Sequence, residues 1–248
     1  MAGTALTAFA GEIANYVKGA SKATNATFIT AQTLRTVRDF CKETWMYRET
    51  LADINVVEND DDYTLTAITT NCDSPVIHAI EWVKFKEDGA ADSTFTFLEP
   101  WNLETEERKG GAATSAYMEQ TADRPEVYWM EPNDELFIKP IPNSTAAGTG
   151  NMRVKAIQCP DLDATTVPTF LYDDWVECIA QGVAGRVLQM ASYKWYNPQL
   201  AEYYQTMYKQ TRNEEARRQR WDGRVRQDGK IKFHRAFTGG HRQRNWIF

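Results

Sequence analysis

The chain has 248 residues, 42% of them hydrophobic and 25% charged, so it can form one large domain or two small ones around a core that needs no disulfides. Its four cysteines form no CxxC pair, which argues against a disulfide-stapled secreted scaffold and favours a reducing compartment. We expect neither a membrane span nor a signal peptide, because no apolar run approaches roughly 18 residues and no basic region precedes an apolar one.

Charge is distributed unevenly along the chain. The net charge is −6, but residues 212–248 contain 11 Lys and Arg against 4 Asp and Glu, which leaves −13 on residues 1–211. An acidic body with a basic tail indicates that the tail meets a partner that the body does not. The aromatic share of 12%, with eight tryptophans, favours contact surface between proteins slightly over core packing.

Two helical patterns precede residue 58. The first lies within residues 1–24 and ends near Gly19, where a polar linker begins. Thr30 suits the N-cap of the second helix, whose apolar stripe includes Leu34 and Cys41. This stripe needs a partner, and the helix predicted over 171–190 is the best candidate in the chain.

The period of the apolar residues then changes from 3.6 to 2, so residues 59–164 predict a β-rich module inserted between helical segments. Strands are expected at 63–70, 76–86, 127–130, 136–139 and 152–159, a short helix at 101–109 and a loop at 110–115. The prolines at 125, 132, 140 and 142 make a central position in a sheet improbable at those points.

Residues 168–221 predict two consecutive helices with a break at Asn197-Pro198. In the first, apolar residues recur every three or four positions from Leu171 to Met190. Gly182 and Gly185 cost about 1 kcal/mol each against alanine, and this cost indicates that another helix approaches closely there.

The second of these helices has clear signals at both ends. Asn197 suits its N-cap and Pro198 its first position, where a missing N–H does no harm. An aromatic face follows and turns charged beyond Thr211, so we expect the helix to leave its core and run into solvent or onto a partner.

We expect residues 222–248 to form an extended arm, because basic groups alternate there with aromatic and aliphatic ones between four glycines. Its arginines would pair with acidic rims while Trp246, Ile247 and Phe248 fill a groove of another protein. The candidate docking residues are Arg224, Arg226, Lys230, Lys232, Phe233, Arg235, Phe237, Arg242, Arg244, Trp246, Ile247 and Phe248.

Patterns typical of catalysis or cofactor binding are weak. Residues 60–62 are a run of aspartates that lacks the glycine and distal glutamate of a calcium loop, and it fits a solvated turn better. Cys72 and His78 could share a metal, but nothing nearby completes a tetrahedral site. Because two of the three histidines lie in the arm, no nucleophile–base pair can be assembled. We predict no catalytic residue, no metal and no cofactor.

The order of the elements resembles that of the head-to-tail adaptor proteins of short-tailed phages, also called tail tubular protein A or head completion proteins. The resemblance covers about residues 25–220. It is carried by RPEVY at 124–128, LFIKPIP at 136–142, MRVK at 152–155, Val167-Pro168 and the helix that follows.

This resemblance implies a homo-oligomer, a dodecameric ring beneath the portal, with the tail nozzle or tubular protein below it and genome DNA in its bore. It also implies that the C-terminal region reaches the portal, and that the protein assembles in the host cytoplasm and ends in the neck of the virion. A ring needs two different surfaces on each subunit, and an acidic wall would not hold back phosphate.

The expected fold is therefore α+β: a helical bundle core from residues 1–58 and 165–221, the β-rich module 59–164 and the arm 222–248. Two other functions stay open at this point. One is a nucleic-acid-binding protein whose arm contacts phosphates and stacks bases on Phe233, Phe237 and Trp246. The other is an enzyme of unrecognised type, although we predict that the protein is not an enzyme.

Overall fold

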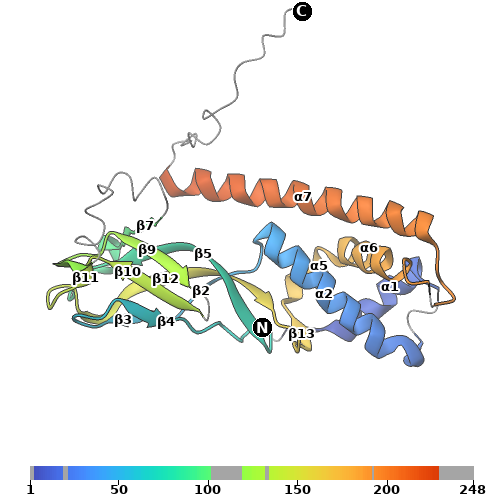
Figure 1. Ribbon diagram of the computed structural model, residues 1–248, viewed down its shortest axis with the longest axis horizontal. Coiled ribbons are helices and arrows are strands. Elements are labelled where there is room, and N and C mark those ends of the chain that lie inside the picture. The colour runs from blue at the N-terminus through green and yellow to red at the C-terminus, as the bar shows by residue number, and fades with distance from the viewer. Residues whose placement is uncertain (1–2, 19–21, 102–118, 132–133, 192, 229–248) are drawn as a thin grey trace, which may run out of the picture.

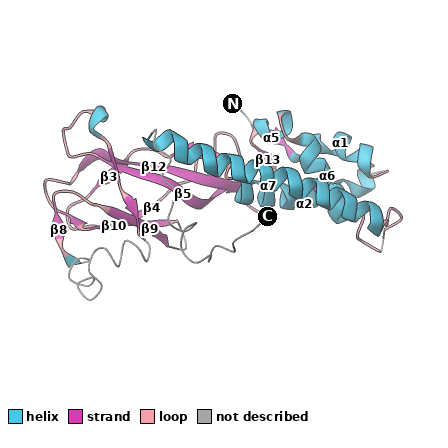
Figure 2. Cartoon of the chain, turned by 90° about the horizontal axis from the view of Figure 1, so that it is seen from above, coloured by secondary structure: helices cyan, strands magenta, loops and turns pink. Residues whose placement is uncertain are grey.

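The computed structural model describes residues 3–18, 22–101, 119–131, 134–191 and 193–228. The molecule is elongated, with most helices at one end and most strands at the other, while β13 lies beside α5 at the helical end (Figure 1). The longest helix, α7, lies along the helical end and continues over the β-rich end, and the view from above shows the same crossing (Figure 2). The chain is thus a mixed α and β fold with one helix spanning its two parts.

The helices differ from the predicted ones mainly at their ends. They are η1 Leu6–Phe9, α1 Ala10–Tyr16, η2 Ala23–Asn25, α2 Ala26–Thr44, η3 Asp92–Thr94, α5 Thr169–Asp173, α6 Val176–Val187 and α7 Pro198–Asp228. Thr30 is therefore not the N-cap of α2, which begins at Ala26. The pattern over 171–190 forms two helices, because Trp175 leaves the helical conformation (φ −128°) and its ring packs 5.2 Å from that of Phe40.

Helix α6 packs closely against both α2 and α7, as its glycines predict. A Cβ at Gly182 would lie 2.6 Å from Thr36 Cγ2 of α2 and 2.8 Å from Tyr208 Cδ2 of α7. A Cβ at Gly185 would lie 2.6 Å from Gln205 Cγ. The Tyr208 hydroxyl also donates to the carbonyl of Thr36 over 3.2 Å, so the three helices share one buried contact.

The start of α7 confirms the predicted cap. The backbone N–H of Leu200 donates to Asn197 Oδ1 over 3.1 Å, and Pro198 occupies the first helical position. Asn197 thereby satisfies one of the donors that every helix leaves unpaired at its N-terminus.

The β-rich end contains two main sheets. The first has the order β2-β12-β5-β6, with β3 also paired to β12, and the second has the order β4-β10-β9-β7. Their strands are β2 Arg48–Thr50, β3 Ile54–Val56, β4 Asp62–Thr64, β5 Pro75–Phe85, β6 Thr96–Phe97, β7 Glu99–Pro100, β9 Val127–Glu131, β10 Glu135–Lys139 and β12 Gly148–Pro160. Two smaller pairs join β8 Thr121–Ala122 to β11 Ile141–Pro142, and β1 Thr4–Ala5 to β13 Thr166–Val167.

The strands begin earlier than the sequence pattern predicts, because β2 and β3 precede residue 59 and pair with β12. The strand expected at 63–70 is only the short β4. The predicted short helix and loop between residues 102 and 115 lie outside the described residues. The division of the chain into four domains stays a prediction.

Each end of the molecule has its own apolar core. Side chains of η1, α1, α2, α6 and α7 form one cluster, which includes Phe9, Phe40 and Val183. Side chains of both main sheets form the other, which includes Phe85 and Leu136. No helix in the described part of the chain is both long and apolar enough to cross a lipid bilayer.

Candidate interaction surfaces

Arg48 joins the β-rich end to α7. Its side chain donates from Nε to the carbonyl of Trp45 over 2.6 Å, from Nη1 to Glu81 Oε1 over 3.2 Å, and from Nη2 to the carbonyl of Gln219 over 3.4 Å. Trp45 ends α2 in the left-handed conformation, at φ 58°, and so turns the chain toward β2. One guanidinium therefore contacts the end of α2, strand β5 and the distal half of α7.

Glu81 reaches this junction because it is an extra residue in β5. Trp82 pairs with Lys155 and Ile80 pairs with Ala156, so β5 has one more residue than β12 at this point. Such a bulge turns a side chain away from its regular position. Glu81 Oε2 also lies 3.2 Å from Lys155 Nζ, so its carboxylate faces two cations.

The outer face of the second sheet has a row of three aromatic rings. Phe137 of β10 lies directly opposite Trp129 of β9, and their rings stack at 5.3 Å and 10°. Trp101 follows β7, and its ring lies 6.5 Å from that of Trp129. Leu136 and Ile138, the neighbours of Phe137 on β10, point into the core, as alternation along a strand requires.

Carboxylates surround this row. We call the outward-facing set Asp62, Glu99, Trp101, Trp129, Glu131, Glu135 and Phe137 the acidic aromatic face. Glu131 lies directly opposite Glu135 in the sheet, and like charges in opposite positions destabilise a strand pair. Among the described residues neither of these two carboxylates has a Lys or Arg nitrogen within 4.0 Å, and the neighbouring Lys139 pairs with Asp61 instead.

The outer face of the first sheet is cationic. Lys84 Nζ lies 4.8 Å from the centre of the Trp82 ring and 4.5 Å from that of Phe97. Arg153 pairs with Asp53 through two 2.7 Å contacts and lies 4.5 Å from the Phe95 ring. Cations held over aromatic rings in this way gain about 0.5–1 kcal/mol at exposed sites.

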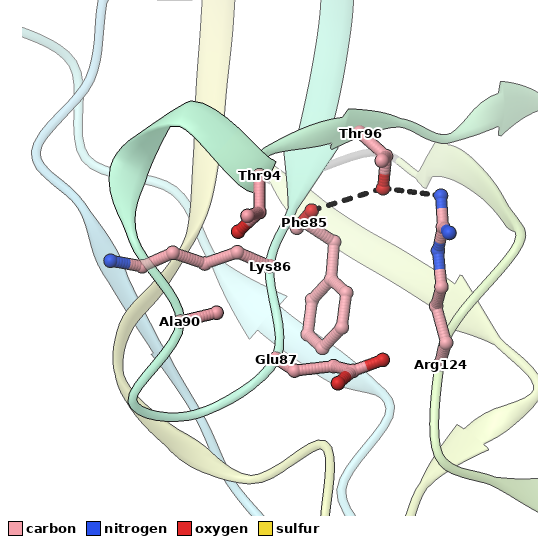
Figure 3. A pocket seen from close by; sticks show the side chains of 7 residues that line it. All are labelled: Phe85, Lys86, Glu87, Ala90, Thr94, Thr96 and Arg124. Atoms are coloured by element: carbon pink, nitrogen blue, oxygen red, sulfur yellow. Dashed lines mark hydrogen bonds between the residues drawn. The ribbon is translucent and has the colours of Figure 1, made fainter.

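A small open pocket lies beside this cationic surface (Figure 3). Thr96 Oγ1 donates to the carbonyl of Phe85 over 3.2 Å and accepts a hydrogen bond from Arg124. The Lys86 amine points away from Arg124 in Figure 3 and pairs with Asp92 at 2.7 Å. The pocket residues are Phe85, Lys86, Glu87, Ala90, Thr94, Thr96 and Arg124, and they form no pair of nucleophile and base.

The residues considered as metal ligands lie in two separate places. In the described part of the chain, one group brings three ligand atoms together: the side chains of Asp60, Asp61 and Asp62, in the predicted turn. Cys72 Sγ is buried and donates to the carbonyl of Thr166 over 3.2 Å, whereas His78 is exposed on β5. The cluster fits a solvated acidic turn, which is the interpretation that the sequence favours.

The predicted docking residues fall on two sides of the last described residue. Arg224 and Arg226 lie in α7, so residues 222–228 are helical and not part of an extended arm. A single glycine costs a helix about 1 kcal/mol, and Gly223 does not end this one. The other ten, from Lys230 to Phe248, lie outside the described residues, and their role stays a prediction.

Neither the acidic aromatic face nor the Arg48 junction is among the features predicted from the sequence. For the face part of a local signal exists: Trp129 and Glu131, like Glu135 and Phe137, lie two positions apart, which places each pair on one side of its strand. The junction has no such signal, because Arg48, Glu81 and Gln219 are far apart in the chain.

Comparison with known proteins identifies one relationship. The family model of the SU10 adaptor protein matches residues 4–228, which is most of the chain and nearly all of its described part. No curated protein matches the sequence.

Proposed function

Since the chain belongs to the SU10 adaptor protein family, a family of phage head-to-tail adaptors, we propose that copies of it form a closed ring between the portal and the tail. A structural role at the neck of the virion follows from the family itself. The proposal adds the ring, its dodecameric size, the portal above, the tail nozzle or tubular protein below, and the passage of genome DNA. The family match over residues 4–228 is the observation that carries it.

The surface of the protomer supports a ring. A closed ring is built from two different surfaces on each subunit, so large apolar side chains should be exposed in more than one place. Phe97 is 45% exposed on the β-rich end, and Tyr196 and Tyr203 are 49% and 57% exposed at and near the start of α7. We propose that these two regions belong to the interfaces between neighbouring copies.

Helix α7 supports the role of a spacer. Its 31 residues span about 46 Å at 1.5 Å per residue, and the helix packs against both α6 and α2. The contact of Arg48 with Gln219 fixes the distal half over the β-rich end. In the proposed ring, helices α1, α2, α6 and α7 form the rigid wall, and the end of α7 presents residues 229–248 to the portal.

The charge of the body supports DNA passage. Residues 1–211 have a net charge of −13, and a wall of this sign repels phosphate and does not retain it.

The experiment is electron microscopy and mass measurement of the purified chain, alone and mixed with portal particles of its phage. Twelve copies of 28.4 kDa would give a ring of roughly 340 kDa, either alone or on the portal. A chain that ends at Asp228 keeps every described residue of both apolar cores, so it should fold but no longer bind the portal. Normal portal binding by this truncated chain would refute the docking role of the arm.

The second candidate, a nucleic-acid-binding protein, rests on the net charge of +7 in residues 212–248. It predicts a monomer that binds oligonucleotides with an affinity that falls steeply as salt increases. If the chain were a monomer with this behaviour and formed no ring on the portal, the proposed ring, portal contact and DNA passage would be wrong. Nucleic-acid binding would then be the better proposal.

A further inference from the structure

We propose that the cationic surface of the first sheet on one copy of the chain binds a patch of tyrosines at the helical end of the next copy. The inference rests on the proposed ring, because it names the two surfaces that join neighbouring copies in it. We call these partners the lysine–aromatic surface, which consists of Trp82, Lys84 and Phe97, and the tyrosine patch, which consists of Glu12, Tyr16, Glu177, Tyr203 and Tyr204.

The lysine–aromatic surface holds an ammonium group between two rings. Lys84 of β5 lies directly opposite Phe97 of β6, and its Nζ lies 4.5 Å from the centre of the Phe97 ring and 4.8 Å from that of Trp82. The two rings meet edge-on at 6.0 Å, and Phe97 is 45% exposed. The ammonium group is thus held in a defined position beside an exposed ring.

This lysine lacks a counter-charge. Arg153, which lies opposite Lys84 on β12, pairs with Asp53, and Lys155 pairs with Glu81. In the described part of the chain, by contrast, no carboxylate oxygen lies within 4.0 Å of Lys84 Nζ. A carboxylate from another molecule can therefore bind this lysine without breaking an existing ion pair.

Three tyrosine rings join α1 to the start of α7. The ring of Tyr16 meets that of Tyr204 edge-on at 5.3 Å, and Tyr204 meets Tyr203 at 5.4 Å. Tyr203 is 57% exposed, whereas Tyr16 and Tyr204 are partly buried against the helical core. The row therefore ends in one ring that a partner can cover.

Two carboxylates lie near these rings. Glu12 precedes Tyr16 by one turn of α1, and Glu177 lies in the first turn of α6. Burial raises the pKa of Tyr16, a hydrogen bond with Gln181 lowers it, and the charges of Glu177 and Glu12 raise it again, which places both carboxylates near the Tyr16 hydroxyl. The ion pairs between described residues include neither glutamate, so the patch has negative charge that no cation of the described chain neutralises.

The two surfaces lie at different ends of the elongated molecule (Figure 1). Tyr16 and Tyr204 pack against the helical core, whereas Lys84 lies between Val83 and Phe85, which belong to the core of the two main sheets. One folded chain therefore cannot bring its own two surfaces together, and the occupant of each surface is another copy.

The match between the surfaces selects a second copy as the partner. Each surface has an exposed ring. One has a lysine without a carboxylate and the other has two carboxylates without a cation, so each supplies what the other lacks. Because the surfaces differ and lie at different ends, the same contact can repeat from copy to copy, and it closes into a ring when the rotation between copies allows.

The test is photo-cross-linking between copies. An unlabelled full-length chain with a photo-cross-linking amino acid in place of Phe97 is mixed with an isotope-labelled full-length chain, in solution and on portal particles. Irradiation should link position 97 to labelled peptides that contain Tyr16 or Tyr203, identified by mass spectrometry. In the sample without portal, about tenfold dilution should lower the yield severalfold, because the contact joins two chains.

Two charge variants make the test specific. Lys84→Glu should lower the yield by about fivefold or more, and so should Glu12→Lys with Glu177→Lys, because like charges then face each other. When the first variant carries the cross-linker and the second is the labelled chain, the yield should return to within about twofold of its original value, because opposite charges face each other again. Mixing would not reverse a loss that came from damage to the fold of either variant.

The matched control is Arg35→Glu, which makes the same change of net charge as Lys84→Glu at an exposed site on α2 and should leave the yield unchanged. Circular dichroism checks that each variant folds. If Lys84→Glu does not fold, Lys84→Gln takes its place, with a smaller loss of yield expected.

The proposal is wrong if position 97 links to other elements, links only within its own chain or gives no link. It is also wrong if Arg35→Glu acts as strongly as Lys84→Glu, or if mixing the two charge variants restores nothing. A ring on the portal with links elsewhere would keep the proposed ring and refute this contact. The expected links in an assembly of only two copies would keep this contact and refute the ring.

Discussion

The guanidinium of Arg48 lies 3.2 Å from the carboxylate of Glu81, and both side chains are only 15% exposed. The same guanidinium donates to the carbonyl of Gln219 in α7, so this ion pair is also where the β-rich end is fastened to the long helix. Because the pair is mostly withdrawn from water, removing one partner leaves the other charge poorly solvated.

We predict that Arg48→Ala lowers the free energy of unfolding by about 1–3 kcal/mol, the usual cost of losing hydrogen bonds to a charged group that stays half-buried. Denaturant unfolding followed by circular dichroism measures the change. Arg217→Ala removes an exposed arginine from α7 and should change stability by no more than about 0.5 kcal/mol. Equal effects of the two variants would show that the junction contributes nothing to stability.

Gly182→Ala should destabilise the protein by about 1–3 kcal/mol, although alanine is the better helix former. The added methyl group would lie 2.6 Å from Thr36 Cγ2 and 2.8 Å from Tyr208 Cδ2, so α6 would have to move away from α2 and α7. Thermal unfolding measures the loss.

Gly11→Ala is the matched control for this substitution, because Gly11 also lies in a helix but a Cβ there meets nothing within 4 Å. It should stabilise the protein by about 0.5–1 kcal/mol, the helix propensity difference. If Gly182→Ala were as favourable as Gly11→Ala, close packing at α6 would not be the reason for the glycine.

The elements that the sequence predicts best are those with local causes. The glycines of α6 and the Asn197-Pro198 start of α7 are confirmed, because a propensity cost and a cap depend on residues within one turn. The strand predicted at 152–159 lies within β12, which begins four residues earlier, at Gly148, and ends at Pro160.

Where the structure differs from the elements predicted from the sequence, the cause is a contact between residues that are distant in the chain. Strands β2 and β3 are too short to show a period, and they exist because β12 offers them a pairing edge about 100 residues later. Trp175 interrupts the helix to pack on Phe40, a choice that depends on where α2 lies. The acidic aromatic face likewise depends on the register between Phe137 and Trp129, which the separate strand patterns do not specify.

Asp73 should make the stability of the protein depend on pH in the acid range. Burial by itself raises the pKa of its carboxyl, but hydrogen bonds from the Thr165 hydroxyl and from the backbone N–H groups of Thr166 and Thr165 outweigh it and hold the pKa well below the ordinary value. A depressed folded pKa means that the stabilisation is complete above the unfolded pKa, about 3.9, and is lost as the pH falls below it.

Asp73→Asn should therefore cost about 1 kcal/mol at pH 7, a modest value because the site is open to solvent. The difference between the two proteins should shrink as the pH falls from about 5 to about 2. Urea unfolding across this range measures it, with Asp163→Asn, an exposed neighbour bound to Ser74, as the control. A difference that stays constant with pH would show that Asp73 acts through packing and not through its charge.

The four cysteines should be unreactive in the folded protein and reactive once it unfolds. All four are free and buried, and burial raises the pKa of Cys72 to about 11 and that of Cys178 to about 12. Because the thiolate is the reacting form, a disulfide reagent at pH 8 should titrate almost none of them in native buffer and four per chain in denaturant.

Cys72 is the most informative of the four, since its Sγ donates to the carbonyl of Thr166 beside Asp73. In a denaturant series at pH 8, selective labelling of Cys72 would show that this corner, next to the β1–β13 pair, opens before the rest of the chain unfolds. Labelling of all four at once would show instead that the chain unfolds as one unit.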